Sequence, residues 1–429
     1  MKYKFGEIFH VVDGDRGANY PKEGDFFDEG FCLFLNAGNV TKTGWSFNKV
    51  SFITKEKDSK LRKGRVERGD TVLTTRGTVG NAAYYGDSIK YDHIRINSGM
   101  VILKAKDKQI IDDKFIYYLV TSPIAKKTIE LFCSGSAQPQ LPIKDFIKIK
   151  YDLPSLKIQK KIVSIIGSYD NLIENNNKRI RLLEQMAENL YKEWFVRFRF
   201  PGHEKTEFVN TKLGKLPTSF SVTNMNSVFE DYIGGGWGND DESEDFPISA
   251  SVIRGADFPN VWHYDVSTCP RRYHKKSNYK ARQLQDGDIV MEISGGTSEQ
   301  PVGRTVLVTQ DMINRFEGGR VICASFCKMI RLKKEIISPY FFYFWMHYLY
   351  DTRIIDRYQL QSTGIINFKF EPFLKKGIVM LPPKELMQSF EDKINPIFKE
   401  INQLAILNDN LSRQRDLLLP RLMSGKLEV

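Results

Sequence analysis

Two carboxylates in the segment GDIVMEIS, Asp288 and Glu292, are spaced as in half of a metal-dependent nuclease site. Such a site also needs a lysine two residues further on, and the sequence has none there. In addition, Asp288 belongs to a Gly-Asp turn signal that occurs twice in the chain. We therefore interpret the pair as structural.

The other motifs that would support catalysis are incomplete. Gly214-Lys215 and Gly425-Lys426 lack the upstream glycine and the following hydroxyl residue of a phosphate-binding loop. GGGWG (234–238) favours a turn, because no strand–helix fingerprint follows it. Cys323 and Cys327 have no second ligand pair at zinc-finger spacing, and VICASFCKMI alternates like a strand. We expect no catalytic site, metal or cofactor in this chain.

Basic segments indicate contact with a polyanion instead. Residues 271–282 (RRYHKKSNYKAR) and 55–69 (KEKDSKLRKGRVERG) each precede a strand that begins with Gly-Asp. Phosphate groups are contacted mainly by such Lys and Arg side chains. A solvated loop is the alternative interpretation of both segments. The candidates for DNA contact here are Lys60, Arg62, Lys63, Arg65, Arg68, Arg271, Arg272, Tyr273, Lys275, Lys276, Tyr279, Lys280 and Arg282.

Small polar turns offer hydrogen-bonding groups that suit the edges of bases. They are GANYP (17–21), TTRGTVGN (74–81), SGSAQPQ (134–140) and QSTGIIN (361–367), of which the last two look like repeated polar loops. Ordinary turn chemistry explains the same residue types equally well. The candidate base readers are Asn19, Tyr20, Arg76, Thr78, Asn81, Ser136, Gln138, Gln140, Gln361, Thr363 and Asn367.

Composition limits the class of protein. The chain has 429 residues, 41% of them hydrophobic, and a formal net charge of +11, which suits a polyanionic partner. The most apolar stretch, YFFYFWMHYLY (340–350), is too short for a membrane span and predicts a buried helix. The N-terminus has no apolar region of a signal peptide. Five scattered cysteines predict no disulfide framework and fit a reducing cytoplasm.

The chain carries the same signals twice, in the same order. VERGDTVLTTRGTVG (66–80) is matched by LQDGDIVMEISGGT (284–297), and the aromatic helix DDKFIYYLV (112–120) by SPYFFYFWM (338–346). A strand that stops at Leu-Pro ends each copy, in KIKYDLPSLKIQ (148–159) and GIVMLPPKELMQ (377–388). GEIFHVVDGDRG (6–17) also matches NSVFEDYIGGGWG (226–238) loosely, and the polar loop 133–141 matches 360–368. Five matches in order predict a duplicated unit of roughly 200 residues.

A long helical pattern follows each Leu-Pro. Apolar residues recur in steps of four and three from Ile162 to Trp194 and from Phe390 to Leu422, which is the spacing of a coiled-coil seam. Pro396 should kink or restart the second helix. Each seam carries one asparagine, Asn176 or Asn408.

An antiparallel, centred pairing of the two helices would bring Asn176 opposite Asn408. In that pairing the residue numbers of each layer sum to 584, so that Ile162 meets Leu422 and Trp194 meets Phe390. A buried asparagine pair would fix the register of the helices. The alternative is two independent polar gaps that face water.

These elements predict an α/β (α+β) fold with two duplicated globular domains separated by a long antiparallel two-helix coiled-coil spacer with pseudo-two-fold symmetry. The expected segments are domain 1 (1–152), spacer helix 1 (153–200), domain 2 (201–380) and spacer helix 2 (381–429). Two different domains related in this way should read different half-sequences of a DNA duplex, and if both face one side of it, the half-sites should lie roughly 10 bp apart, centre to centre.

The layout resembles the specificity (S) subunit of type I DNA restriction–modification enzymes. Residues 153–195 look like the central conserved region of that family, and 381–429 look like its C-terminal conserved region. GDRGANYP (14–21) and the Gly-Asp motifs resemble its target recognition domains.

The resemblance implies a non-catalytic subunit that reads a bipartite site in double-stranded DNA. It also implies two methyltransferase (M) subunits on the spacer helices and optional motor-nuclease (R) subunits, with S-adenosylmethionine, ATP and Mg on these partners. Adenine methylation and cleavage would then reside in the partner subunits. A structural coiled-coil adaptor and a standalone DNA nuclease or modification enzyme are the alternatives.

Overall fold

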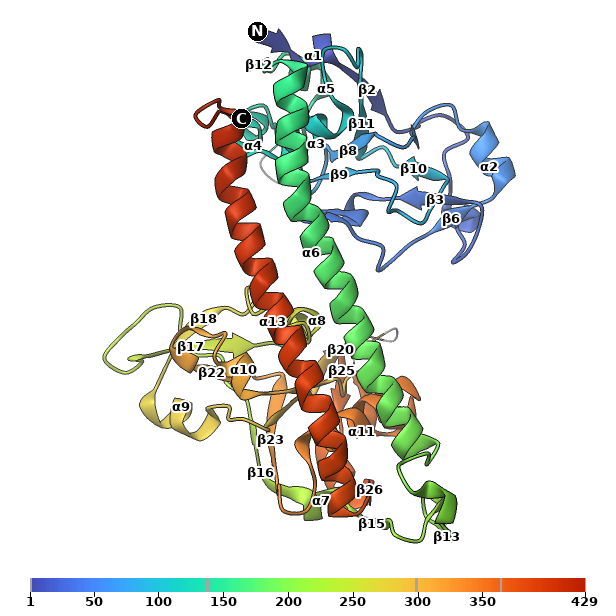
Figure 1. Ribbon diagram of the computed structural model, residues 1–429, viewed down its shortest axis with the longest axis vertical. Coiled ribbons are helices and arrows are strands. Elements are labelled where there is room, and N and C mark those ends of the chain that lie inside the picture. Colours follow the sequence, from blue (N-terminus) through green and yellow to red (C-terminus); the bar gives the residue numbers. More distant parts are fainter. Residues whose placement is uncertain (1, 136–138, 298–299, 363–364, 429) are drawn as a thin grey trace. The chain divides into compact units, whose positions relative to one another are not determined.

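The computed structural model describes residues 2–135, 139–297, 300–362 and 365–428. It divides into two compact units. Unit 1 comprises Met1–Ile173 with Asn410–Val429, and unit 2 comprises Glu174–Asp409. Each unit therefore holds one globular domain and a part of each long helix (Figure 1). The segment boundaries expected at residues 152, 200 and 380 stay a prediction.

The domain of unit 1 is built on two four-stranded sheets. The first has the order β2 (Phe9–Asp13), β11 (Met100–Ala105), β8 (Thr71–Thr74) and β9 (Ala82–Tyr84), with all pairs antiparallel. The second has the order β6 (Phe52–Ile53), β3 (Cys32–Leu35), β10 (Ile94–Ile96) and β7 (Arg65–Val66), in which β3 and β10 are parallel. Short strands β1 (Lys2–Lys4) and β12 (Lys150–Asp152) pair at the chain end of the domain.

Short helices complete unit 1. The aromatic helix α3 (Asp113–Thr121) begins at Asp112, whose side chain accepts hydrogen bonds from the Lys114 and Phe115 backbone N–H groups. Its buried face packs on the first sheet. The remaining elements are α1 (Phe5–Ile8), β4 (Val40–Thr41), β5 (Gly44–Trp45), α2 (Lys55–Lys60), α4 (Pro123–Leu131) and α5 (Ile143–Phe146).

The domain of unit 2 repeats this plan, so the duplication inferred from the sequence is confirmed. Its first sheet has the order β16 (Phe229–Gly234), β23 (Cys327–Leu332), β19 (Ile289–Glu292) and β21 (Thr305–Leu307). Its second sheet joins β18 (Arg271–His274), β17 (Ile248–Ile253) and β22 (Val321–Cys323), in which β17 and β22 are parallel, as β3 and β10 are. β15 (Ser221–Asn224) pairs with β26 (Ile378–Leu381), as β1 pairs with β12.

Unit 2 adds further elements to the repeat. They are β13 (Phe208–Thr211), β14 (Gly214–Pro217), α7 (Met225–Val228), α8 (Phe258–Val261), α9 (Lys276–Arg282), β20 (Ser294–Gly296), α10 (Gln310–Ile313), α11 (Pro339–Asp351), β24 (Gln359–Ser362), β25 (Ile365–Phe368) and α12 (Phe370–Lys376). Helix α11 is the predicted buried aromatic helix, with Phe341, Phe342, Phe344 and Trp345 in the core. Of the polar loop expected at 361–367, residues 361–362 and 365–367 instead belong to the antiparallel pair β24–β25.

Two long helices run through the chain. Helix α6 spans Leu156–Tyr191 and continues into a π-helical turn, Lys192–Val196, while α13 spans Lys384–Met423. The cluster of asparagines around Asn176 does not interrupt α6, as predicted. Helix α13 continues through Pro396, so the helix does not restart there; the other expected outcome, a kink at Pro396, stays a prediction.

In unit 1 the two helices pack along the predicted seam. Ile162 and Ile166 of α6 share one core cluster with Leu419 and Leu422 of α13. One turn further on, the Arg415 guanidinium donates to Asp170 at 2.9 Å. Along this contact the residue numbers rise on α6 while they fall on α13, so the two helices are antiparallel in unit 1.

Unit 2 contains the asparagine layer. The Asn176 side-chain nitrogen donates to the Asn408 side-chain oxygen at 2.9 Å, and Asn176 is only 4% exposed. The Asn408 nitrogen donates in turn to the Asn177 side-chain oxygen at 2.9 Å. Trp194 and Phe390, a second predicted pair, have ring centroids 6.0 Å apart. The predicted contact between Asn176 and Asn408 is thus confirmed.

None of the described helices combines the length and the apolar content that a bilayer span requires.

Candidate nucleic-acid interface

The repeated Gly-Asp turns stabilise the first sheet of each domain, and their carboxylates are already paired. Gly69 and Gly287 adopt positive φ angles of 95° and 86°. The following carboxylates, Asp70 and Asp288, each accept a backbone N–H bond at 2.7 Å from the residue three positions earlier. Cations on the neighbouring strand neutralise both carboxylates. They are Lys104, 3.3 Å from Asp70, and Arg331, which donates two bonds to Asp288.

Glu292 is also paired. The Arg304 guanidinium donates to its two oxygens at 2.7 and 2.8 Å, and both side chains are buried. Asp288 and Glu292 are therefore bound to different arginines and do not converge on one point. The structural interpretation of this acidic pair agrees with these contacts.

Past the Gly-Asp strand of domain 1, four segments meet at one edge. The Thr75 and Arg76 N–H groups both donate to the Gly99 carbonyl, at 2.8 and 3.2 Å, and the Leu141 N–H donates to the Thr75 carbonyl at 2.9 Å. Arg76 also forms an isolated bridge with Gln140. We call this arrangement of residues 14–16, 75–76, 97–99 and 139–141 loop platform 1.

Domain 2 makes the same hydrogen bonds with different residues. The Ile293 and Ser294 N–H groups donate to the Phe326 carbonyl at 2.9 and 3.3 Å, and the Phe368 N–H donates to the Ile293 carbonyl at 2.8 Å. Ser294 pairs with Asn367 in the sheet. This arrangement, residues 235–237, 293–294, 324–326 and 367–368, is loop platform 2.

The match assigns equivalent positions. Ser294 of platform 2 corresponds to Arg76 of platform 1, Asn367 to Gln140, and Phe326 to Gly99. Both platforms also need a glycine after the first strand. A Cβ on Gly14 would lie 2.2 Å from the Asn97 carbonyl oxygen, and one on Gly235 would lie 2.1 Å from that of Ala324.

The side chains that the platforms expose differ in chemistry. Platform 1 presents Arg16, Arg76 and Gln140, which are cationic or amide groups. Platform 2 presents Phe326, 62% exposed, and Trp237, 40% exposed, beside a pocket of about 460 Å³ that Ser294 and Ser325 also line. Two platforms of one architecture with different side chains are suited to contact different partner sequences.

Sequence analysis missed both aromatic residues of platform 2. Trp237 lies in the glycine-rich turn, and Phe326 lies in the segment read as a single strand. That segment is in fact two strands, β22 and β23, with an intervening turn at 324–326. The repeat offset was the available signal, since it aligns this turn with Asn97–Gly99.

Part of the basic segment of domain 1 stabilises the fold. Arg65 and Arg95 both pair with the buried Asp58, and Arg68 donates to Asp92 while it stacks 4.2 Å from the Tyr85 ring. Lys60, Arg62 and Lys63 are exposed.

The candidates at 17–21 and 74–81 divide in the same way. Tyr20 packs edge-on against Phe34, and the Asn81 amide donates to the Val40 carbonyl at 3.1 Å, so both hold the domain together. Asn19 and Thr78 are exposed, although the Asn19 amide also donates to the Lys60 carbonyl at 3.3 Å. Of this group, Asn19 and Thr78 remain accessible to a partner, as does the partly exposed Arg76 of loop platform 1.

The segment 271–282 is not the loop that we considered but β18 followed by α9. Within this segment, the Arg272 side chain is 12% exposed and pairs with Asp240. Its guanidinium carbon lies 4.8 Å from the centre of the Trp237 ring. Arg271 contacts Ser249 and Glu317, and Arg282 donates to the Gly234 carbonyl.

The rest of this segment is mixed. The Tyr279 hydroxyl is buried, and Tyr273 is half-buried. Lys275, Lys276 and Lys280 are exposed. The exposed acidic run 240–245 lies beside β18 through the Asn239–Tyr273 bridge, which lowers the local positive potential.

Four candidates cannot be placed. Ser136, Gln138 and Thr363 lie outside the described residues, as does the side chain of Gln361. Asn367 is placed, and its side-chain oxygen accepts from the Ser294 hydroxyl at 2.6 Å. Contact of any of these residues with DNA stays a prediction.

Comparison with known proteins agrees with the repeated layout. Residues 1–185 match the family model "Type I restriction modification DNA specificity domain". The chain is 25% identical over 371 residues to the type I restriction enzyme MjaIX specificity subunit of Methanocaldococcus jannaschii, covering 84% of this chain and 78% of that protein. It is 22% identical to the HindI specificity subunit of Haemophilus influenzae, covering 96% and 98% of the two chains.

A solved structure shows the same fold. The crystal structure of the S subunit of a type I restriction–modification system from M. genitalium superposes with a TM-score of 0.52 at 13% identity. The match covers 98% of this chain and 95% of that chain.

Proposed function

Because residues 1–185 match the type I restriction modification DNA specificity domain and curated specificity subunits match most of the chain, we propose that the chain is a specificity subunit of a type I restriction–modification system in which each of the two domains reads one half of a bipartite DNA site. The observation that carries this proposal is the pair of loop platforms. They repeat the same backbone hydrogen bonds, so they present side chains in the same way. Their exposed side chains differ, so the two half-sites should differ in sequence.

We further propose that the chain itself performs no chemistry. The carboxylates that most resemble a metal site, Asp288 and Glu292, are each bound to an arginine, so binding a cation would require both ion pairs to break. Methylation of adenine, and cleavage where it occurs, would then be carried out by partner subunits. S-adenosylmethionine, ATP and Mg would be bound by those partners.

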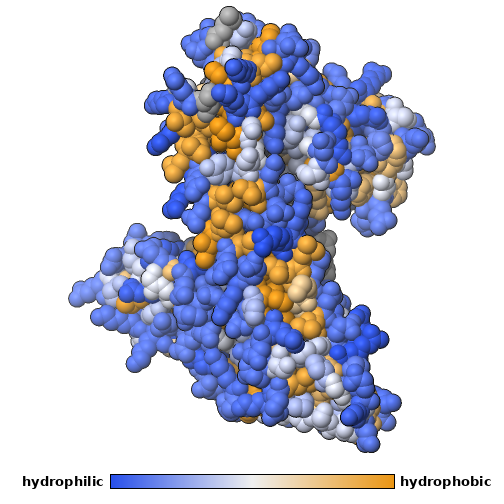
Figure 2. Space-filling view, viewed as in Figure 1, coloured by the Kyte–Doolittle hydropathy of each residue, from blue (hydrophilic) through white to orange (hydrophobic). Residues whose placement is uncertain are grey.

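The long helices supply a surface for two methyltransferase subunits. In unit 2, Leu182 and Met186 lie one turn apart on α6 and are 62% and 59% exposed, and Leu407 of α13 is 46% exposed. In unit 1, Leu172 and Leu417 are 51% and 59% exposed. Figure 2 shows apolar surface over the region of these helices. Exposed apolar residues grouped in this way are typical of protein interfaces.

Co-expression of the chain with a methyltransferase subunit tests the proposal. We expect the two proteins to purify together and the complex to retain double-stranded DNA in a gel-shift assay, with an affinity that falls as salt is raised. A complex that forms but never binds DNA would favour the structural adaptor. Cleavage or methylation by the purified chain alone would favour the standalone enzyme.

A further inference from the structure

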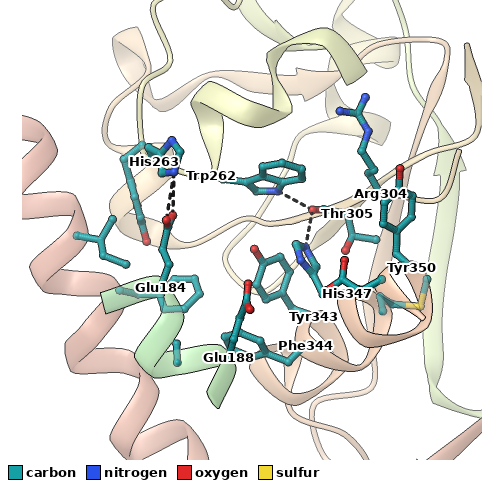
Figure 3. A pocket seen from close by; sticks show the side chains of 16 residues that line it. Glu184, Glu188, Trp262, His263, Arg304, Thr305, Tyr343, Phe344, His347 and Tyr350 are labelled. Carbon is teal, nitrogen blue, oxygen red and sulfur yellow. Dashed lines mark hydrogen bonds and ion pairs between the residues drawn. The ribbon is translucent and has the colours of Figure 1, made fainter. Parts of the chain in front are cut away.

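A cavity of about 290 Å³ lies entirely within unit 2, under α11 and beside both long helices (Figure 3). Helix α6 contributes Glu184, Ala187 and Glu188, and α13 contributes Phe398 and Ile401. The remaining walls come from α11 and from the segments 262–264 and 304–305. Ala187 is the smallest residue of the α6 seam. It leaves space that a leucine, the residue at the neighbouring seam positions Leu183 and Leu190, would fill.

Aromatic rings form most of the interior. Trp262, Tyr343, Phe344 and Tyr350 line it, and the Tyr343 ring lies 4.2 Å from the ring of His347. The Trp262 and His347 rings are fixed, because their nitrogens contact the Thr305 carbonyl oxygen at 2.8 and 3.2 Å (Figure 3). Burial lowers the pKa of His347, so this imidazole is neutral and places no positive charge in the wall.

Carboxylates surround the mouth. Glu184 contacts His263 at 3.1 Å, and Glu188 lies 3.4 Å from Lys192. Asp351, at the end of α11, forms no ion pair within the described part of the chain. The cation that lines the interior, Arg304, is already bound to Glu292 through two hydrogen bonds. Glu184 and Glu188 are thus each matched by a nearby cation, and Asp351 supplies the carboxylate that is not matched within the described part of the chain.

One buried polar group in the wall lacks a partner. Thr305 is only 1% exposed, and its buried hydroxyl group forms no hydrogen bond within the described part of the structure. Buried hydroxyl groups in folded proteins nearly always have a hydrogen-bond partner. Because the hydroxyl oxygen has almost no accessible surface, an occupant of the cavity would reach it only after the wall rearranges.

We propose that this cavity binds a small organic cation, with its ammonium or guanidinium group near Glu188 and Asp351 and its apolar part between Trp262 and Tyr343. Aromatic faces attract cations, and the carboxylates at the mouth add to that attraction. The volume lies at the lower limit for ligand pockets, about 300 Å³, which suits a small amine and excludes a nucleotide. The same chemistry would accept a free amine or one Lys or Arg side chain of a docked subunit.

Calorimetric titration of the full chain without DNA tests this site. The probes are 2-phenylethylamine, butylamine and the neutral analogue 2-phenylethanol. We expect the aromatic amine to bind at least tenfold more tightly than the alcohol, because only the amine pairs with the carboxylates. Equal affinities of amine and alcohol would overturn the proposal.

Two variants and a control locate the binding. Glu188→Gln combined with Asp351→Asn removes charge at the mouth and should weaken amine binding at least tenfold. Ala187→Leu fills the cavity without a change in charge and should abolish binding. Glu174→Gln, which removes a carboxylate of α6 that does not line the cavity, should bind as the wild type does. If the variant that combines Glu188→Gln with Asp351→Asn is folded and binds the amine as tightly as the wild type, the proposal is overturned.

A competition experiment separates the two sources of the cation. If the natural occupant is a side chain of a methyltransferase subunit, addition of that subunit will displace the amine. If the occupant is a free amine, the assembled complex will bind 2-phenylethylamine as tightly as the chain alone. Neither result depends on DNA recognition, so the site can fail while the proposed function holds, and the reverse.

Discussion

The asparagine layer of unit 2 allows a quantitative test of the contact between α6 and α13. Replacement of Asn176 by Leu removes its hydrogen bond to Asn408, which contributes about 1 kcal/mol, and leaves the half-buried Asn408 oxygen without that donor, at a cost of ~1 kcal/mol or more. The buried leucine gains about 1.5–3 kcal/mol, so a single substitution changes stability little in either direction. A double-mutant cycle cancels this gain.

The cycle compares wild type, Asn176→Leu, Asn408→Leu and the double variant. The summed stability of the two matched layers, Asn with Asn and Leu with Leu, should exceed that of the two mixed layers by a coupling energy of about 2 kcal/mol. Chemical denaturation followed by tryptophan fluorescence measures it, because four of the five tryptophans lie in unit 2. Asn175, which is exposed on the same helix, is the control, and its coupling to Asn408 should be within about 0.5 kcal/mol of zero. A coupling equally small for Asn176 would refute the pairing.

Three further predictions concern the partner surface, the reading platforms and an ion pair. Leu182→Glu combined with Met186→Glu should abolish co-purification with the methyltransferase subunit while the chain stays folded. Arg181→Glu, at an exposed neighbouring position, should leave co-purification unchanged. If the double variant still assembles normally, this helix surface does not bind the methyltransferase subunit. Phe326→Ala should relax specificity only in the half-site read by domain 2, and Arg76→Ala only in the other half, each by about 1–3 kcal/mol in a competition gel-shift series; equal effects on both halves would contradict separate reading. The hydrogen bond to the Glu184 carboxylate raises the pKa of His263 above its ordinary 6.5. The ion pair therefore stabilises unit 2 fully below pH 6.5, and this contribution disappears as pH rises through the raised pKa. His263→Gln should remove that part of the stability–pH profile, and an unchanged profile would exclude a contribution from the ion pair.

Repetition and periodicity made most of the fold predictable. The Gly-Asp turns, the aromatic helices α3 and α11, and the Leu-Pro strand ends are local signals, and their recurrence in one order identified the duplication. The contact between Asn176 and Asn408 also followed from spacing alone, because a seam of period 3.5 fixes which layers meet once the helices are taken as antiparallel.

Long-range pairing was not predictable in this way. The parallel pairs β3–β10 and β17–β22 join segments about 60–70 residues apart, and no local pattern encodes them. The same limitation affected the candidate site. Arg272 and Arg282 were candidate phosphate ligands, and each binds a partner distant in sequence, Asp240 or the Gly234 carbonyl; their contact with DNA stays a prediction.

The platforms show what the sequence conceals at a reading surface. Phe326 is exposed because a turn, not a continuous strand, connects β22 with β23, and this turn accepts two backbone bonds from the end of β19. Within CASFC the phenylalanine has the pattern of a core residue. Only alignment with Gly99 of the first repeat reveals that its position belongs to the loop platform.

Mapping of methylated adenine across the genome of cells that express this chain with its methyltransferase subunit tests the central claim most directly. The account predicts methylation at one bipartite motif, lost when the chain is deleted and altered in a single half when domain 2 is exchanged for that of a relative. Methylation that persists without the chain, or a motif that changes in both halves after this exchange, would contradict it.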